Sequence, residues 1–241
     1  MAGGLTFADF AARAANPALS DYERVDFPVY RAGKESAIYR DILSKLTNLD
    51  RECQNVVEIG PGCSLLAYVM MAICRKWAHD LTLVDCREML DQLPNLSYVT
   101  RYAAQFPKCP ELLKQYQKRV NVILAYSVIH HVYIDSNPFE FVDAALDLLA
   151  EGGQLLIGDI PNVSKRARFF NSPAGMEYHR RHMPAGSLLV SQPVEAGRLD
   201  DSVILAIVAR CRARGFDAYI LPQSPDLPMA NRREDILVVR P

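Results

Sequence analysis

The chain has 241 residues, half of them apolar, which suits one domain with a sizeable core and excludes a fibrous or disordered protein. Its 27 Lys and Arg nearly balance its 28 Asp and Glu, and the net charge of -1 excludes a general attraction to nucleic acid or anionic membranes. We find no apolar run of membrane-spanning length and no signal peptide, so we expect a cytoplasmic protein.

The first 34 residues form an extension that contributes little to a sheet. A small amphipathic segment covers residues 7–15, and a stretch interrupted by prolines and acidic residues follows it. The regular pattern begins after this extension, because apolar residues recur at helical spacing over 38–46. This periodicity predicts an amphipathic helix that packs on the sheet.

Residues 56–64, Val-Val-Glu-Ile-Gly-Pro-Gly-Cys-Ser, predict a buried strand, a glycine loop and the start of a helix. Gly60 and Gly62 allow the backbone to turn sharply and to approach a ligand closely. Ser64 can cap the next helix, and residues 65–72 are apolar on nearly every side, as in a helix that lies against a sheet. An ordinary strand-to-helix turn is the alternative interpretation.

The chemistry of the glycine loop favours a cationic ligand over a phosphate. Leu65 stands where the dinucleotide fingerprint has its third Gly or Ala, and no Lys follows the loop as in a P-loop. Glu58 precedes Gly60 and would repel a pyrophosphate but attract positive charge. S-adenosylmethionine is such a ligand, since it carries a sulfonium and an ammonium group and no phosphate.

A second acidic residue follows at the distance of one strand-helix-strand unit. Residues 81–85, Leu-Thr-Leu-Val-Asp, predict a strand that ends in Asp85, 23 residues after Gly62. A carboxylate in this position can accept hydrogen bonds from both ribose hydroxyls of an adenosine. Alternatively, Asp85 begins a turn or caps the helix of Met89 and Leu90.

Strands and helices continue to alternate along the rest of the chain. We expect strands at 96–100, 120–125 and 154–159, and helices at 111–118 and 138–149, with Gly152 and Gly153 closing the second helix. Residues 161–197 break the alternation and are expected to form an insertion over the strand ends. A helix at 201–214 and two strands at 217–221 and 235–239, without a helix between them, complete a doubly wound, mostly parallel α/β sheet.

These motifs, with the Tyr126 to His131 stretch and the Gly152-Gly153 turn, resemble the successive motifs of class I S-adenosylmethionine-dependent methyltransferases over roughly residues 35–240. The Ile129-His130-His131-Val132 sequence is similar to the small-molecule members. The resemblance implies a Rossmann-like sheet of seven strands with a C-terminal antiparallel hairpin. It also implies S-adenosylmethionine as the cofactor, residues 1–34 as a lid, and residues 35–241 as the methyltransferase domain with a substrate-side insertion at about 161–197. A loosely ordered tail is the alternative to the lid.

The resemblance also indicates the cofactor-binding residues. They are Glu58, Gly60, Pro61, Gly62, Asp85, Cys86, Ala104, Gln105 and Tyr126. Many relatives carry an Asp near the adenine just after the third strand, where this chain reads Arg-Tyr-Ala-Ala-Gln over 101–105. Gln105 or a backbone group is therefore expected in its place.

His130 and His131 are the candidate catalytic residues. Ligands of open α/β sheets bind beyond the carboxyl ends of strands, where these two side chains, Ser127 and Asp159 can converge. Methyl transfer requires alignment and, for a hydroxyl, removal of a proton, for which a His with a pKa near neutrality is suited. The rate should then rise with pH through the neutral range. The alternatives are that the histidines cap the helix at 138–149 or pack beneath the lid, and that Asp159 or alignment alone serves catalysis.

The acceptor is expected to be small and to carry oxygen. The insertion holds five basic residues that suit an anionic acceptor or form a solvated face: Lys165, Arg166, Arg168, Arg180 and Arg181. A weak similarity, in residues 27–46 and after Asp159, connects the chain with methyltransferases of bacterial sugars and surface polysaccharides. The predicted activity is methyl transfer to a hydroxyl of a sugar or similar metabolite. A nicotinamide-dependent (NAD) oxidoreductase and a non-catalytic methyltransferase-like binding subunit remain alternatives.

Other ligands are disfavoured by the sequence. The six scattered cysteines lack the spacing of a zinc site, and His179 and His182, three residues apart, favour substrate contacts over metal ligation. No basic stripe with interleaved aromatics points to nucleic acid, and the fourth strand lacks the Pro-Pro-aromatic motif of base methyltransferases. A homo-oligomer remains open.

Overall fold

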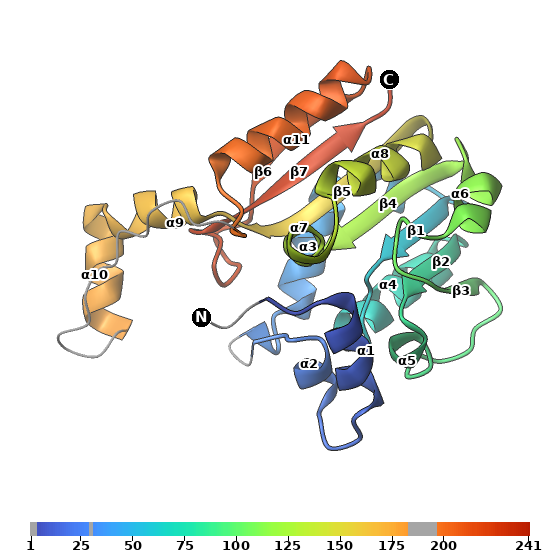
Figure 1. The fold of residues 1–241 in the computed structure, drawn as a ribbon, viewed down its shortest axis with the longest axis horizontal. Helices are drawn as coiled ribbons and strands as arrows, with labels where there is room; N and C mark the ends of the chain where they lie inside the picture. Colours follow the sequence, from blue (N-terminus) through green and yellow to red (C-terminus); the bar gives the residue numbers. More distant parts are fainter. Residues whose placement is uncertain (1–3, 29–30, 183–196) are drawn as a thin grey trace.

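Residues 4–28, 31–182 and 197–241 are described by the computed structural model. Within them, seven strands form one sheet in the order β3-β2-β1-β4-β5-β7-β6 (Figure 1). β1 to β5 run parallel, whereas β7 is antiparallel to both β5 and β6. The strands are β1 Asn55–Ile59, β2 Asp80–Asp85, β3 Val99–Ala103, β4 Val120–Tyr126, β5 Leu149–Pro161, β6 Asp217–Pro222 and β7 Arg233–Val239. The predicted seven-stranded sheet with its C-terminal hairpin is confirmed.

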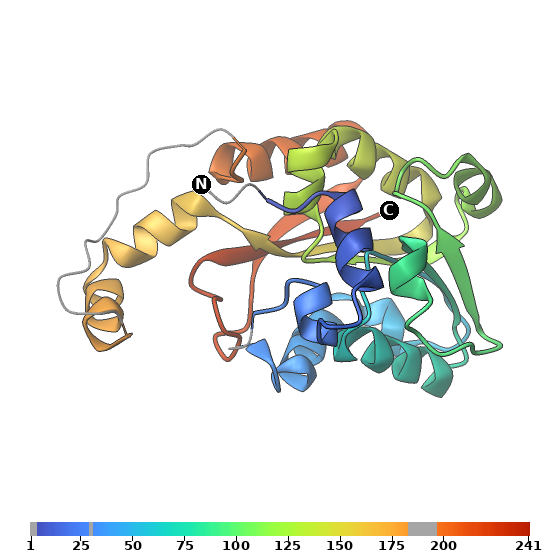
Figure 2. The same cartoon turned by 60° about the horizontal axis from the view of Figure 1, so that its bottom comes forward.

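Helices cover both faces of this sheet (Figures 1 and 2). One face carries α6 Pro110–Tyr116, α8 Pro138–Leu148 and α11 Asp201–Ala213, and the other carries α3 Glu35–Lys45, α4 Leu65–Lys76 and α5 Arg87–Leu90. Each face has its own apolar cluster, because neighbouring strand residues point to opposite sides: Val57 joins the first cluster and Val56 the second. The central strands are apolar on both faces for this reason.

The N-terminal extension forms α1 Phe7–Ala15 and α2 Asp21–Arg24, which pack on each other. Thr6 and Asp9 form a reciprocal capping box at the start of α1, so the helix begins where the sequence pattern begins. α1 also packs against α5, at the end of the sheet where the parallel strands finish (Figure 1). A short 3-10 helix, Thr47–Asp50, joins α3 to β1.

Two expected boundaries were wrong, and one helix was not predicted. β3 begins at Val99 rather than at residue 96, because Leu96 and Tyr98 pack on the second apolar cluster from the turn before the strand. β5 begins at Leu149, so Gly152 and Gly153 lie inside the strand instead of closing α8. A two-turn helix, α7 Ile129–Asp135, follows β4 in a segment for which no element was predicted. At both boundaries, apolar residues pack in the core although their backbone conformation differs from the one that their pattern predicted.

The described part of the insertion forms two helices, α9 Val163–Phe170 and α10 Pro173–His182. Both views show them projecting from the body of the domain beyond the end of β5 (Figures 1 and 2). The expectation that this segment lies over the strand ends is therefore wrong for residues 163–182. Residues 183–196 of the expected insertion lie outside the described residues.

Candidate functional site

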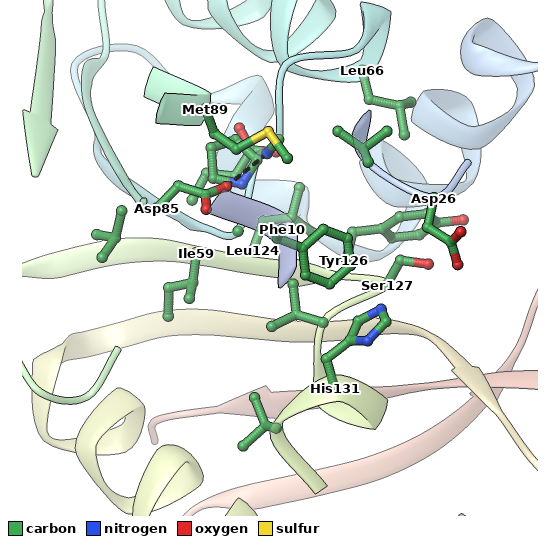
Figure 3. A pocket seen from close by; sticks show the side chains of 18 of the residues that line it. Phe10, Asp26, Ile59, Leu66, Asp85, Met89, Leu124, Tyr126, Ser127 and His131 are labelled. Carbon is green, nitrogen blue, oxygen red and sulfur yellow. Dashed lines mark hydrogen bonds between the residues drawn. The ribbon is translucent and has the colours of Figure 1, made fainter. Parts of the chain in front are cut away.

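A cavity of about 240 Å³ lies at the carboxyl ends of the parallel strands. It lies where the strand order reverses, since β1 has β2 on one side and β4 on the other, and ligands of such sheets bind at this point. Ten of the eleven predicted site residues line it: Glu58, Gly60, Pro61, Gly62, Asp85, Ala104, Gln105, Tyr126, His130 and His131. Figure 3 shows side chains of the sheet, α1 and α7 converging on this space.

Cys86 is the exception, because it does not line the cavity. It is buried at the start of α5, and its backbone N–H donates to Asp85 Oδ1 at 2.7 Å. Burial raises the pKa of its thiol to about 12, so the thiol stays protonated. Cys86 therefore supports the position of Asp85, and its side chain lies outside the cavity that the other predicted residues line.

The glycine loop has no room for larger side chains. Gly60 has φ +67° and Gly62 has φ +63°, a conformation that side chains disfavour. A Cβ atom at Gly60 would lie 2.7 Å from Val128 Cγ2, and one at Gly62 would lie 2.5 Å from Val25 Cγ1. Ser64 is at the N-cap of α4, but its side chain makes no capping hydrogen bond, contrary to expectation.

Asp85 ties the glycine loop to the end of β2. Its Oδ2 accepts a hydrogen bond from the Gly62 N–H at 3.0 Å, and its Oδ1 accepts one from Cys86. Burial raises the pKa of this carboxyl to about 6, although these two hydrogen bonds and a third from the Cys86 thiol act in the opposite direction. The two ionised oxygens together have about four lone-pair sites, so about one remains for a ligand.

Glu58 is buried beside Asp85 without a complete set of partners. Only 4% of the residue is exposed, and Oε2 has no hydrogen-bond partner among the described residues. Burial, and secondarily the charge of Asp85, raise the pKa of Glu58 to about 8. A buried carboxyl with an oxygen that lacks a hydrogen-bond partner destabilises the folded protein unless a ligand supplies the missing partner.

The adenine side of the cavity differs from the expectation for Gln105. Its Nε2 donates to Asp135 Oδ2 at 3.1 Å, and its Oε1 accepts from Lys108 Nζ at 2.9 Å. The Ala104 N–H donates to the Asp85 backbone oxygen at 3.0 Å. Polar groups of both residues therefore already have protein partners, which leaves packing as their clearest contribution.

The start of the chain lies over this cavity. Phe7 and Phe10 of α1 line it, and Phe10 meets the His131 ring edge-on with centroids 4.7 Å apart. The Phe7 N–H donates to Asp135 Oδ2 at 3.1 Å, and His131 Nδ1 lies 3.1 Å from the Leu5 oxygen. The described part of the extension is thus fastened to α7, which is the arrangement that a lid requires.

His130 and His131 are on α7, with ring centroids 4.0 Å apart. Burial, followed by the neighbouring His131, lowers the pKa of His130 to about 3, and burial also lowers the pKa of His131. Both rings are therefore neutral at neutral pH, and His130 Nδ1 is buried without a partner among the described residues. His131 agrees with the alternative that the histidines pack beneath the N-terminal segment, because its ring contacts Phe10 and lies close to the Leu5 oxygen.

A cluster of charges that the sequence did not indicate adjoins the cavity at Asp159. This buried carboxylate accepts hydrogen bonds from Arg31 Nη1 and Arg233 Nη1, both at 2.7 Å, and from the Ser127 hydroxyl. Burial alone would raise the pKa of Asp159, but the two guanidinium groups hold it below its usual value. Arg31 and Arg233 line the cavity. No local pattern marked them, because they come from the extension and from β7.

The basic residues of the insertion are mostly engaged within the chain. Arg168 pairs with Asp201, Arg180 and Arg181 pair with Glu177, and Lys165 lies 3.8 Å from Glu234. None of them lines the cavity. The expected alternative, a solvated basic face, therefore describes them better than an acceptor site does, and the structure adds that most of their charges are paired within the chain.

Two further properties concern the described residues as a whole. Within 4–28, 31–182 and 197–241, no group of three or more His, Cys, Asp or Glu side chains could hold a metal ion. His182 of α10 instead stacks on Tyr178, with centroids 4.3 Å apart. No helix in the same ranges combines the length and apolarity needed to cross a membrane.

Comparisons with known proteins agree with this geometry. The sequence profile described as "Methyltransferase domain" matches residues 31–189, and no curated protein matches the chain. A chain in the solved complex between the Haloferax volcanii Trm112 methyltransferase activator and a methyltransferase is 12% identical, with a TM-score of 0.60 and coverage of 97% of this chain and 98% of that one.

Two further solved structures are similar. The plantazolicin methyltransferase BamL, in complex with a triazolic desmethylPZN analog and SAH, is 12% identical, with a TM-score of 0.58 and 97% of each chain covered. A SAM-dependent methyltransferase from Aquifex aeolicus is 10% identical, with a TM-score of 0.56, covering 92% of this chain and 99% of that one. At such identities these likenesses show a shared fold.

Proposed function

The chain belongs to the S-adenosylmethionine-dependent methyltransferases, whose domain profile it matches over 31–189, and we propose that it methylates a small polar molecule at an oxygen atom. The coarser activity, methyl transfer from S-adenosylmethionine, follows from the family. The acceptor class is our proposal, with a sugar hydroxyl as one member of it. We set aside the alternative of an NAD-dependent oxidoreductase, because the family is a methyltransferase family and because Leu65 and the single glycine loop argue against dinucleotide binding.

The main support for this proposal is the buried carboxyl of Glu58, whose Oε2 lacks a hydrogen-bond partner among the described residues. An ammonium or sulfonium near it would favour ionisation of this carboxyl and supply the missing interaction, whereas a phosphate would oppose the ionisation. The glycine loop presents bare backbone to the cavity, because Cβ atoms at Gly60 and Gly62 would collide with neighbouring side chains, and Asp85 keeps a lone pair for a ribose hydroxyl. These residues fit S-adenosylmethionine, with Glu58 for the cationic portion, Gly60 to Gly62 for close backbone approach and Asp85 for the ribose.

When bound, the cofactor supplies a methyl carbon that its sulfonium already activates. The protein must then exclude water and align the acceptor oxygen with that carbon. Phe7 and Phe10 of the lid line the cavity, and the neutral His130 can accept a hydrogen bond from the acceptor hydroxyl through Nδ1, which has no partner among the described residues. A pKa near 3 makes His130 a weak base. We therefore assign it the role of aligning the hydroxyl rather than that of removing its proton.

Calorimetry with the full chain tests the proposal. S-adenosylmethionine and S-adenosylhomocysteine should bind, and NAD should not. Gly33→Ala is a matched control for Gly60→Val: Gly33 also has positive φ, but a Cβ there meets nothing within 4 Å, and it lies outside the cavity. Release of S-adenosylhomocysteine with hydroxyl-bearing acceptors would then separate an enzyme from a binding subunit. Binding of NAD in preference to S-adenosylmethionine would refute the proposal.

A further inference from the structure

Charges along the cavity are separated by sign. Glu58 on β1 and Asp85 on β2 are at one end, and Arg31 and Arg233 adjoin Asp159 at the other. The strand order places β4 and β5 between β1 and β7. With strands about 4.8 Å apart, roughly 14 Å separates the Glu58 strand from the Arg233 strand. The acidic end suits the cationic cofactor, and the guanidinium end lies on the side that remains for the acceptor.

Arg233 has hydrogen-bonding capacity that the described residues do not use. Its Nη1 donates to the Asp159 backbone oxygen at 2.9 Å and to Oδ2 at 2.7 Å. Its Nε is buried without a hydrogen-bond partner among the described residues, and no hydrogen bond there involves Nη2. Nε and Nη2 together form a guanidinium fork, which matches the two oxygens of a carboxylate or phosphate.

The surrounding charges favour an anion at this end. Arg31 and Arg233 share Asp159, while Lys45, behind them, is shared by Asp41 and Asp235, each at 2.6 Å. Among the described residues of this ion-pair network, the excess positive charge of the two arginines lies toward the cavity, and the excess negative charge around Lys45 lies behind it. Two other carboxylates line the cavity, but Asp26 pairs with Arg13 and Asp135 accepts from Phe7 and Gln105.

We propose that Arg233, with Arg31 beside it, binds an anionic group of the methyl acceptor, a carboxylate or a phosphate. This inference rests on the proposed function and narrows its acceptor to a molecule that carries both a nucleophilic oxygen and an oxyanion. The anion docks at the end of β7 and directs the remainder of the acceptor toward Ser127, His130 and the transferable methyl group. Arg233 thereby determines which acceptors bind, and it takes no part in the chemical step.

The test compares three probes on the full chain carrying S-adenosylhomocysteine: benzoate, phenyl phosphate and the uncharged benzamide. Competition calorimetry or ligand-observed NMR gives their affinities. A charged hydrogen bond contributes about 1.5–3 kcal/mol, so one or both anions should bind about ten- to a hundredfold tighter than benzamide. A preference for benzoate identifies a carboxylate acceptor, and a preference for phenyl phosphate identifies a phosphorylated one.

Substitutions locate the effect. Arg233→Met should abolish the preference for anions, and Arg233→Lys, which keeps the charge without the fork, should retain part of it. Arg232→Met is the matched control, because Arg232 is adjacent in sequence, lies over the Phe170 ring and does not line the cavity. It should behave as the wild type. Affinity for S-adenosylhomocysteine should stay within about twofold in every variant, which also reports folding.

Two results would overturn this inference while leaving the proposed function intact. The first is that wild-type protein with S-adenosylhomocysteine bound shows no preference for either anion over benzamide, a comparison that does not depend on any variant folding. The second is an unchanged preference in Arg233→Met or Arg233→Lys. Failure of the wild type to bind S-adenosylhomocysteine would instead contradict the proposed function.

Discussion

Replacing Glu58 by Gln should stabilise the free protein and weaken cofactor binding, in a manner that depends on pH. Glu58 has a folded-state pKa of about 8 against an ordinary value of 4.5, because the buried site disfavours its charge. The folded state therefore holds a proton that the unfolded chain loses as the pH rises above 4.5. The free energy of unfolding consequently falls as pH rises from about 4.5 to 8 and becomes level above it.

The size of this effect follows from the same two values. Each pH unit between them costs about 1.36 kcal/mol, so at pH 7 Glu58 lowers the free energy of unfolding by about 3 kcal/mol. Gln is neutral at every pH and has nearly the same shape. Glu58→Gln should therefore match the wild type near pH 4.5 and exceed its stability by about 3 kcal/mol at pH 7.

Cofactor binding should respond in the opposite direction. The cationic ligand favours the ionised carboxylate, so binding near pH 7 releases a proton and the affinity of the wild type rises with pH up to about 8. Glu58→Gln should bind S-adenosylmethionine about 1.5–3 kcal/mol more weakly and lose this pH dependence.

Denaturant unfolding at several pH values measures the stability, and calorimetry in buffers of different ionisation enthalpy measures proton release. Glu88→Gln is the control, because Glu88 is only half-buried on α5 and lies outside the cavity. A stability difference between wild type and Glu58→Gln that stays constant from pH 4.5 to 8 would contradict the assigned protonation. Unchanged affinity for S-adenosylmethionine in the folded variant would contradict the role given to Glu58 in binding.

Three other substitutions probe the cavity. Asp85→Ala should weaken S-adenosylmethionine binding by about 1.5–3 kcal/mol in calorimetry, since it removes an acceptor for ribose and the bond that holds Gly62; a folded variant with wild-type affinity would exclude this role. Gly60→Val should abolish binding, because its Cβ would already lie 2.7 Å from Val128, and retained binding would show that the loop does not contact the cofactor. His130→Ala should lower kcat with little change in cofactor affinity, by about a hundredfold or more if His130 also takes the proton. With a pKa near 3, His130 should give no pH limb between about pH 5.5 and 8.5, so a limb there that disappears in His130→Ala would refute its neutral, buried state.

Short-range patterns were sufficient for the centre of the fold. Parallel strands covered on both faces need apolar side chains throughout, and the glycine loop needs residues that accept positive φ, so β1, β2, β4 and the loop could be found locally. The charge of Glu58 and the spacing to Asp85 also indicated the class of cofactor. Alternation of strands and helices then predicted the sheet and its final hairpin.

Only the tertiary structure decided which other side chains meet at the site. Arg31 and Asp159 are 128 residues apart in the sequence, and Arg233 and Asp159 are 74 apart, so no local period connects them. His131 meets Leu5 across 126 residues, and this contact joins α7 to the described part of an extension that the sequence left open as a tail or a lid. The depressed pKa of His130 also depends on the fold, because burial is its largest cause and the charge of the neighbouring His131 only the second.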